Sequence, residues 1–294
     1  MDLLDTVVGK AFLVRTLVDT GIARPGRPDR VVGALAALHR WGPTPAGGYA
    51  ASAARHPDAL ALVDELGALT FRQIEDRTTR LANALADAGV NEGDGVAILC
   101  RNHRGFIEAT VALSKLGADA LYLNTMFAGP QIADVCAREN PAAIIHDAEF
   151  TGMCDAAADG RLRIIGWTDP GEETAHPTLE ELIARGDDAA PVPPAEKGRV
   201  LILTSGTTGT PKSASRKQPD SLDPAAALLA KIPLRTREAT VIAAPMFHSW
   251  GFAHFTLGMA LSSTLTTVQS RSPNLARNCS WWPANEKMAP AKGV

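Results

Sequence analysis

Short apolar segments alternate with helical segments through most of the chain, and this alternation is the strongest constraint on its fold. Each apolar segment is continuous, as expected for a strand that is buried on both faces of a sheet. The predicted strands cover residues 96–100, 120–123, 142–146, 163–167 and 200–203. Predicted helices at 105–116 and 130–139 lie between them. This order predicts an α/β fold with mainly parallel sheets flanked by helices.

The region before the first of these strands contains a predicted hairpin and a capped helix. Apolar runs at 59–63 and 69–71 are separated by Gly67, which indicates a hairpin. Thr70 is placed to cap a helix over 72–88, and Gly89 to end it. Turn-forming residues at 41–48 and 186–199 indicate two linkers.

Residues 1–41 predict one or two helices with a broad apolar face. This N-terminal helical extension either packs on the rest of the domain or makes peripheral contact with a membrane. The scarcity of basic residues on its polar side favours packing.

Charge and cysteine content narrow the function classes. The chain has 29 basic and 32 acidic residues, a net charge of -3, so no basic excess is available to neutralise a nucleic acid. The four cysteines form no C-x-x-C pair and predict buried thiols in a reducing compartment, with no metal site built from protein ligands. No signal peptide or membrane-spanning run is evident, so the cytoplasm is the expected location.

The predicted strand at 200–203 runs directly into Thr204-Ser205-Gly206-Thr207-Thr208-Gly209-Thr210-Pro211-Lys212. Six of the ten residues from 204 to 213 carry a hydroxyl group, and two are glycine. Glycines let backbone amides approach an anion, hydroxyl groups donate to phosphate oxygens, and Lys212 adds a positive charge. The order is not that of the G-x-x-x-x-G-K-[ST] loop, because Pro211 precedes the lysine. We therefore predict a nucleotide-phosphate loop of another type.

This string closely resembles the signature loop of the adenylate-forming superfamily, which includes acyl-CoA synthetases, luciferases and nonribosomal-peptide adenylation domains. A second resemblance lies in Pro245-Met246-Phe247-His248-Ser249-Trp250-Gly251, which is similar to the superfamily's proline–aromatic–histidine–glycine motif. Ser213 departs from the family pattern, which has glycine after the lysine. The resemblance implies a partial N-terminal domain of the acyl-CoA synthetase-like fold.

The resemblance also implies roles for these residues. Residues 204–210 and Lys212 would bind ATP phosphates, Lys212 and His248 would be catalytic, and His248, Ser249 and Gly251 would line the acid-binding region. The implied reaction consumes Mg²⁺-bound ATP and CoA, and activates a fatty acid or another carboxylic acid. The N-terminal extension and the segment after the loop resemble actinobacterial fatty-acid–CoA ligases.

The resemblance covers about residues 45–263, so we expect a partial AMP-binding domain at 42–263. Residues 264–294 change in composition and predict no strand, and we hypothesise that they are a frameshifted tail. The later family motifs and the C-terminal lid domain have no counterpart in this sequence. Two alternatives to a fatty acid–CoA ligase stay open. One is an acyl-AMP ligase that feeds a carrier protein, and the other is a non-catalytic nucleotide-binding remnant.

Overall fold

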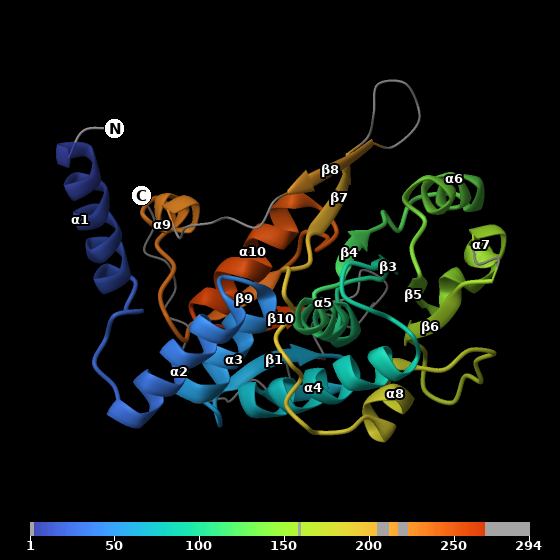
Figure 1. The fold of residues 1–294 in the computed structure, drawn as a ribbon, viewed down its shortest axis with the longest axis horizontal. Coiled ribbons are helices and arrows are strands. Elements are labelled where there is room, and N and C mark those ends of the chain that lie inside the picture. Colours follow the sequence, from blue (N-terminus) through green and yellow to red (C-terminus); the bar gives the residue numbers. More distant parts are fainter. Residues whose placement is uncertain (1–2, 158–159, 205–211, 217–222, 268–294) are drawn as a thin grey trace, which may run out of the picture.

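A computed structural model describes residues 3–157, 160–204, 212–216 and 223–267. The larger of its two sheets has the strand order β6-β5-β3-β4-β7-β8 (Figure 1). In that order the strands are Leu162–Trp167, Ala143–Asp147, Gly95–Leu99, Asp119–Tyr122, Val200–Thr204 and Lys212–Arg216. All neighbouring strands are parallel except β7 and β8. The predicted strands at 96–100, 120–123, 142–146, 163–167 and 200–203 are therefore confirmed, with ends shifted by a residue or so.

The smaller sheet has the order β2-β1-β10-β9. Strands β1 (Leu60–Asp64) and β2 (Gly67–Thr70) form the predicted hairpin, and Gly67 takes a positive φ of 105° that favours glycine. Strand β10 (Thr264–Thr267) lies between β1 and β9 (Ala239–Ile242) and is parallel to both. The expectation that no strand follows Thr264 is therefore wrong for these four residues. Three of them are threonines and only Leu265 is apolar, and both neighbouring strands supply their backbone partners.

Helices separate and cover the two sheets. They are α1 (Leu3–Asp19), α2 (Pro28–Trp41), α3 (Pro45–Arg55), α4 (Phe71–Asp87), α5 (Arg104–Leu116), α6 (Gly129–Glu139), α7 (Thr151–Cys154), α8 (Leu179–Arg185), α9 (Asp223–Leu229) and α10 (Ser249–Ala260). Apolar residues of α4 and α5 pack with residues of both sheets in one core. A second core joins the opposite face of the larger sheet to α6 and α7. The result is a layered α/β fold.

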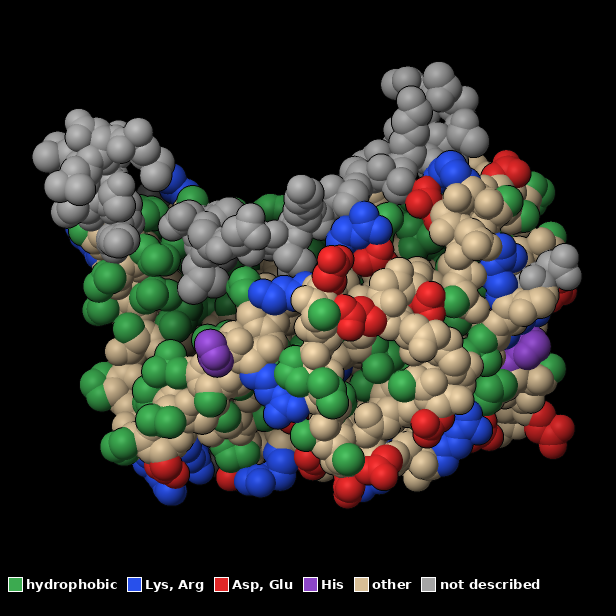
Figure 2. Space-filling view, in the orientation of Figure 1, with side chains coloured by type: hydrophobic (Ala, Val, Ile, Leu, Met, Phe, Trp, Pro, Cys, Tyr) green, Lys and Arg blue, Asp and Glu red, His purple; other side chains and the backbone are tan. Residues whose placement is uncertain are grey.

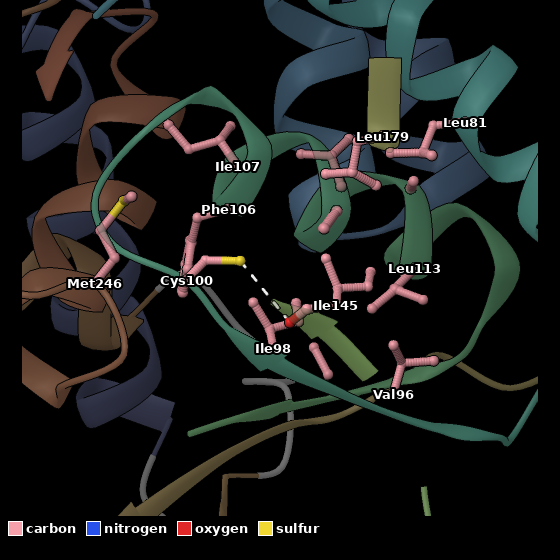
Figure 3. Close-up of a cluster of buried hydrophobic side chains, with 14 of the residues drawn as sticks. Leu81, Val96, Ile98, Cys100, Phe106, Ile107, Leu113, Ile145, Leu179 and Met246 are labelled. Atoms are coloured by element: carbon pink, nitrogen blue, oxygen red, sulfur yellow. Dashed lines mark hydrogen bonds between the residues drawn. The ribbon is translucent and has the colours of Figure 1, made fainter. Parts of the chain in front are cut away.

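Helix α5 is the centre of the main core. Figure 3 shows Phe106 and Leu113 of this helix beside Ile98 and Ile145, which come from neighbouring strands. The alternate residues of β3 face the second core, so the strand is buried on both sides. A helix that is buried on almost every side must also bury its polar residues, and these need partners.

The most completely paired of these polar residues is Arg104, at the start of α5. Its backbone N–H donates to Oδ2 of Asp64 at 3.0 Å, and its Nε lies 3.1 and 2.9 Å from the two carboxylate oxygens. Its Nη2 also donates to the backbone oxygen of Gly67, at 3.1 Å. The Asp64 side chain is fully buried. This pair therefore fixes α5 to β1 and joins the two layers.

Two predictions for connecting segments have different outcomes. The helix after the hairpin is confirmed: Thr70 accepts from the N–H of Gln73 at 3.2 Å and caps α4. The linker prediction at 41–48 is wrong at its end, because α3 begins at Pro45. Thr44 caps this helix by accepting from the N–H of Gly47 at 3.1 Å. The other predicted linker, 186–199, contains no helix or strand before residue 200.

The N-terminal extension forms two helices, as predicted. Figure 1 shows α1 at one side of the molecule, near α9, and Figure 2 shows hydrophobic side chains exposed over this region. Val14 and Val18 of α1 are 59% and 57% exposed, and Val32 and Leu35 of α2 are 65% and 62% exposed. Membrane contact by this extension stays a prediction. Among the helices that the structure describes, none is both long and apolar enough to cross a bilayer.

Candidate functional site

The ends of the predicted phosphate loop are held by a strand pair. Strand β7 ends at Thr204, strand β8 begins at Lys212, and these two residues are partners in the antiparallel register. Residues 205–211, and with them Ser205, Gly206, Thr207, Thr208, Gly209 and Thr210, lie outside the described residues. The sheet thus brings the first residue of the predicted loop and its lysine opposite each other on adjacent strands.

The second predicted motif forms the connection from β9 to α10. His248 is the N-cap residue of α10, its N–H donates to the oxygen of Pro245 at 3.0 Å, and its side chain is exposed. Its ring lies 4.7 Å from the ring of Phe247, which is buried. Ser249, the first residue of the helix, is also exposed. Both residues are therefore open to a ligand at the N-terminal end of α10.

Gly251 has a structural reason to be glycine. It is buried in the first turn of α10, and a Cβ at this position would overlap the backbone oxygen of Pro245. The close approach of helix and turn holds His248 at the end of the helix. This contact explains why position 251 is a glycine. The predicted role of Gly251 in substrate binding stays a prediction.

One residue that the sequence analysis did not select positions this turn. Asn102 follows β3 and is a buried residue, 7% exposed. Its Nδ2 donates to the backbone oxygens of Ile242 at 3.2 Å and Ala244 at 2.9 Å, and its Oδ1 accepts from the N–H of Met246 at 2.8 Å. Asn102 therefore ties the end of the larger sheet to the segment that carries His248. A polar run directly after a buried strand, Arg101 to Arg104, was the available signal.

Replacing Asn102 with alanine is expected to lower the free energy of unfolding by about 2–3 kcal/mol, because two carbonyl groups and one N–H group would lose their buried partner. Urea unfolding followed by circular dichroism measures this loss. Asn91→Ala is the matched control, since Asn91 is exposed and should cost less than ~0.5 kcal/mol. Equal losses in the two variants would contradict a positioning role for Asn102.

A buried polar cluster lies beside this connection. His103 Nδ1 accepts from the N–H of Gly105 at 3.0 Å, so Nε2 carries the proton and donates to Asp147 Oδ1 at 2.8 Å. The Asp147 carboxylate also accepts from the N–H of Arg101, at 2.8 Å. Cys100 completes the cluster, and burial raises the pKa of its thiol well above the usual value.

Cys100, His103 and Asp147 are residue types that can bind a metal ion, and in the described part of the chain they lie close enough together to share one. Because hydrogen bonds occupy both ring nitrogens of His103, no lone pair on the neutral ring is available to an ion. The arrangement is therefore a hydrogen-bond network that shapes the loop after β3. Cys100, Cys136 and Cys154 are buried free thiols, in agreement with the prediction, and Cys279 lies outside the described residues.

Comparisons with known proteins agree with this arrangement of sheet and motifs. The family model described as "AMP-binding enzyme" matches residues 49–287. The chain therefore belongs to the AMP-binding enzyme family. It is 32% identical over 211 residues to a feruloyl-CoA synthase of Amycolatopsis sp, covering 71% of this chain and 39% of that protein. It is 27% identical over 183 residues to the long-chain-fatty-acid–CoA ligase FadD13 of Mycobacterium tuberculosis, covering 61% of this chain and 36% of that one.

A solved structure shares the fold. The inhibitor-bound N-terminal domain of FACL13 from Mycobacterium tuberculosis superposes with a TM-score of 0.63 at 26% identity, over 76% of this chain and 56% of that one. The α/β architecture is thus that of acyl-CoA synthetase N-terminal domains, as the sequence predicted. The chain spans less than two-fifths of the length of these two curated relatives.

Proposed function

We propose that this chain provides the nucleotide- and acid-binding part of an ATP-dependent acyl-CoA ligase. In the first step a carboxylate oxygen attacks the α-phosphorus of Mg²⁺-bound ATP, the bond to the β-phosphate oxygen breaks, and pyrophosphate leaves. In the second step the sulfur of CoA attacks the acyl carbon, and AMP leaves. A fatty acid is the finer proposal for the acid, and FadD13 supports it by its name. The similarity to a feruloyl-CoA synthase means that other carboxylic acids, including aromatic ones, stay in the proposal.

The observation that carries the proposal is the pairing of Thr204 with Lys212 at the two ends of the glycine- and hydroxyl-rich string. In the proposed reaction, residues 204–210 and Lys212 hold the phosphates, and Lys212 neutralises charge that builds on the leaving pyrophosphate. His248 and Ser249, exposed at the start of α10, orient the carboxylate, and Gly251 keeps that end of the helix against its turn. Positioning and charge stabilisation supply the catalysis, and no protein nucleophile is needed.

The test is pyrophosphate release by the whole chain, supplied with Mg²⁺, ATP and a panel of fatty and aromatic acids. We expect release that depends on both ATP and acid. Adding CoA should then convert trapped acyl-AMP to a thioester, whereas a carrier-protein ligase would leave the adenylate unchanged with CoA. ATP binding without acid-dependent release would instead assign a nucleotide-binding remnant. Absence of both would contradict the proposal.

A further inference from the structure

A pocket of about 350 Å³ lies where the N-terminal extension meets the smaller sheet. The loop between α1 and α2, the start of α2, the end of α3 with the residue after it, the segment before β9 and the turn after α10 contribute to its wall. Ala260, at the C-terminal end of α10, also lines it. His248 caps the opposite end of that 12-residue helix, roughly 18 Å away at the usual rise per residue. The pocket is therefore separate from the candidate site.

The wall of this pocket is strongly cationic. It contains five arginines and a histidine, namely Arg24, Arg27, Arg30, Arg55, Arg237 and His56. No carboxylate lines it among the described residues. Arg27 is neutralised by Asp29, since its Nη2 lies 2.9 Å from Oδ2 of that residue. The other four arginines have no carboxylate partner in the part of the chain that the structure describes. Four uncompensated positive charges thus surround one cavity.

Backbone contacts hold several of these arginines in place. Arg55 donates to the oxygens of Ile22 at 2.5 Å and Arg24 at 2.6 Å, and Arg30 donates to the oxygen of Arg55 at 3.4 Å. These contacts use carbonyl oxygens and leave the charge in excess. The chain keeps like charges close together here, an arrangement that costs free energy unless an anion offsets it.

Two residues that line this pocket have an unusual backbone conformation. Three described residues other than glycine have a positive φ, and two of them, Arg237 at 66° and Ser262 at 50°, line the pocket. Such conformations cost about 1–3 kcal/mol each for most residues and are retained where the surrounding structure enforces them. Here the N–H of Arg237 donates to the oxygen of Leu261 at 3.0 Å, and the N–H of Ser262 donates to the oxygen of Met259 at 3.1 Å, so both residues are held at the end of α10 beside the pocket.

The pKa of His56 reflects the positive charge around this pocket. Burial and the nearby Arg237, Arg55 and Arg30 guanidinium groups lower the pKa of His56 to about 4. The C-terminal ends of α3 and α10 also meet this region, and each adds about half a negative charge. Four full positive charges exceed that contribution, so the cavity remains attractive to anions.

We propose that this pocket binds a phosphate group, either as free phosphate or pyrophosphate or as the phosphate of a lipid headgroup. Arginine is suited to this ligand because its planar guanidinium presents paired donors to phosphate oxygens. The pocket volume admits one phosphate or a diphosphate with its water. Arg24 and Arg237, which make no side-chain hydrogen bond to other described residues, supply the direct contacts.

The test is a titration of the whole chain with inorganic phosphate and with pyrophosphate, at pH 7 and constant ionic strength. Proton–carbon NMR of the His56 ring reports this pocket, and the His248 ring reports the candidate site. We expect a saturable change at His56. Arg24→Gln and Arg237→Asn should each weaken binding about tenfold, as expected for a lost hydrogen bond to a charged group. Asparagine is chosen because it tolerates a positive φ.

Arg185→Gln is the control, because Arg185 is an exposed residue at the end of α8 and the variant loses the same charge. Circular dichroism checks that each variant is folded. Binding to phosphatidic acid vesicles, but not to phosphatidylcholine vesicles or free phosphate, would assign the lipid headgroup as the source. The proposal is overturned if phosphate, pyrophosphate and phosphatidic acid vesicles all fail to bind. Equal weakening in the Arg185 control, or a response at His248 alone, would also overturn it.

Discussion

Replacing Asp64 with alanine is expected to lower the free energy of unfolding by about 3–5 kcal/mol. The variant would leave the Arg104 guanidinium without the fully buried carboxylate that now pairs with it. The N–H groups of Leu66 and Arg104 would lose their acceptor as well. Since whole domains are stable by only about 5–15 kcal/mol, a loss of this size would remove a large part of the total stability. Guanidinium chloride unfolding at pH 7 measures it.

The matched control is Asp58→Ala. Asp58 also pairs with an arginine, Arg72, at 3.1 Å, but the two side chains are 77% and 60% exposed. Solvent screens such a pair, so we expect a loss of less than ~1 kcal/mol. A loss for Asp64→Ala as small as that of the control would mean that water replaces the carboxylate, and that the pair does not join the layers.

The larger sheet could be predicted from sequence because its strands are continuous apolar runs. Val96 to Leu99 is buried on both faces, so nearly every residue carries the same signal. The strand β8 has no such signal. Its sequence, Lys212 to Arg216, is polar, and the strand exists through its five paired positions with β7. Pairing of this kind cannot be read from a single segment.

The sequence of helix α3 predicts a linker for a different reason. The sequence Thr44-Pro45-Ala46-Gly47-Gly48 is typical of a turn, and two glycines weaken a helix. The same threonine and proline are also helix-start signals. Packing decides between them, because Tyr49 is buried against Phe71 and Phe255, with ring centroids 6.1 and 6.2 Å apart. Tertiary contacts of this kind outweigh local propensity.

The motifs of the candidate site could be found in the sequence, but their supports could not. The loop string and His248 are local patterns with a recognisable order. Asn102 contacts backbone groups 140 to 144 residues away, and nothing in its own neighbourhood indicates that partner. The arginine pocket is a similar case, because Arg24 and Arg237 are brought together only by the fold.

Replacing Lys212 with methionine is expected to reduce acid-dependent pyrophosphate release by about 10²–10³-fold, the usual effect of removing one group that stabilises charge in a transition state. The proposed reaction builds negative charge on the leaving pyrophosphate, and Lys212 is the cation that the β7–β8 register brings opposite Thr204. Methionine keeps the unbranched length of the side chain, so loss of rate would follow from loss of charge.

Lys231→Met is the control, because Lys231 is exposed after α9 and its substitution removes the same charge. If Lys212→Met releases pyrophosphate at the rate of the unmodified chain, Lys212 has only a structural role in β8. Equal slowing in both variants would indicate a general effect of net charge. A fall confined to Lys212→Met would connect the strand pair to the chemistry.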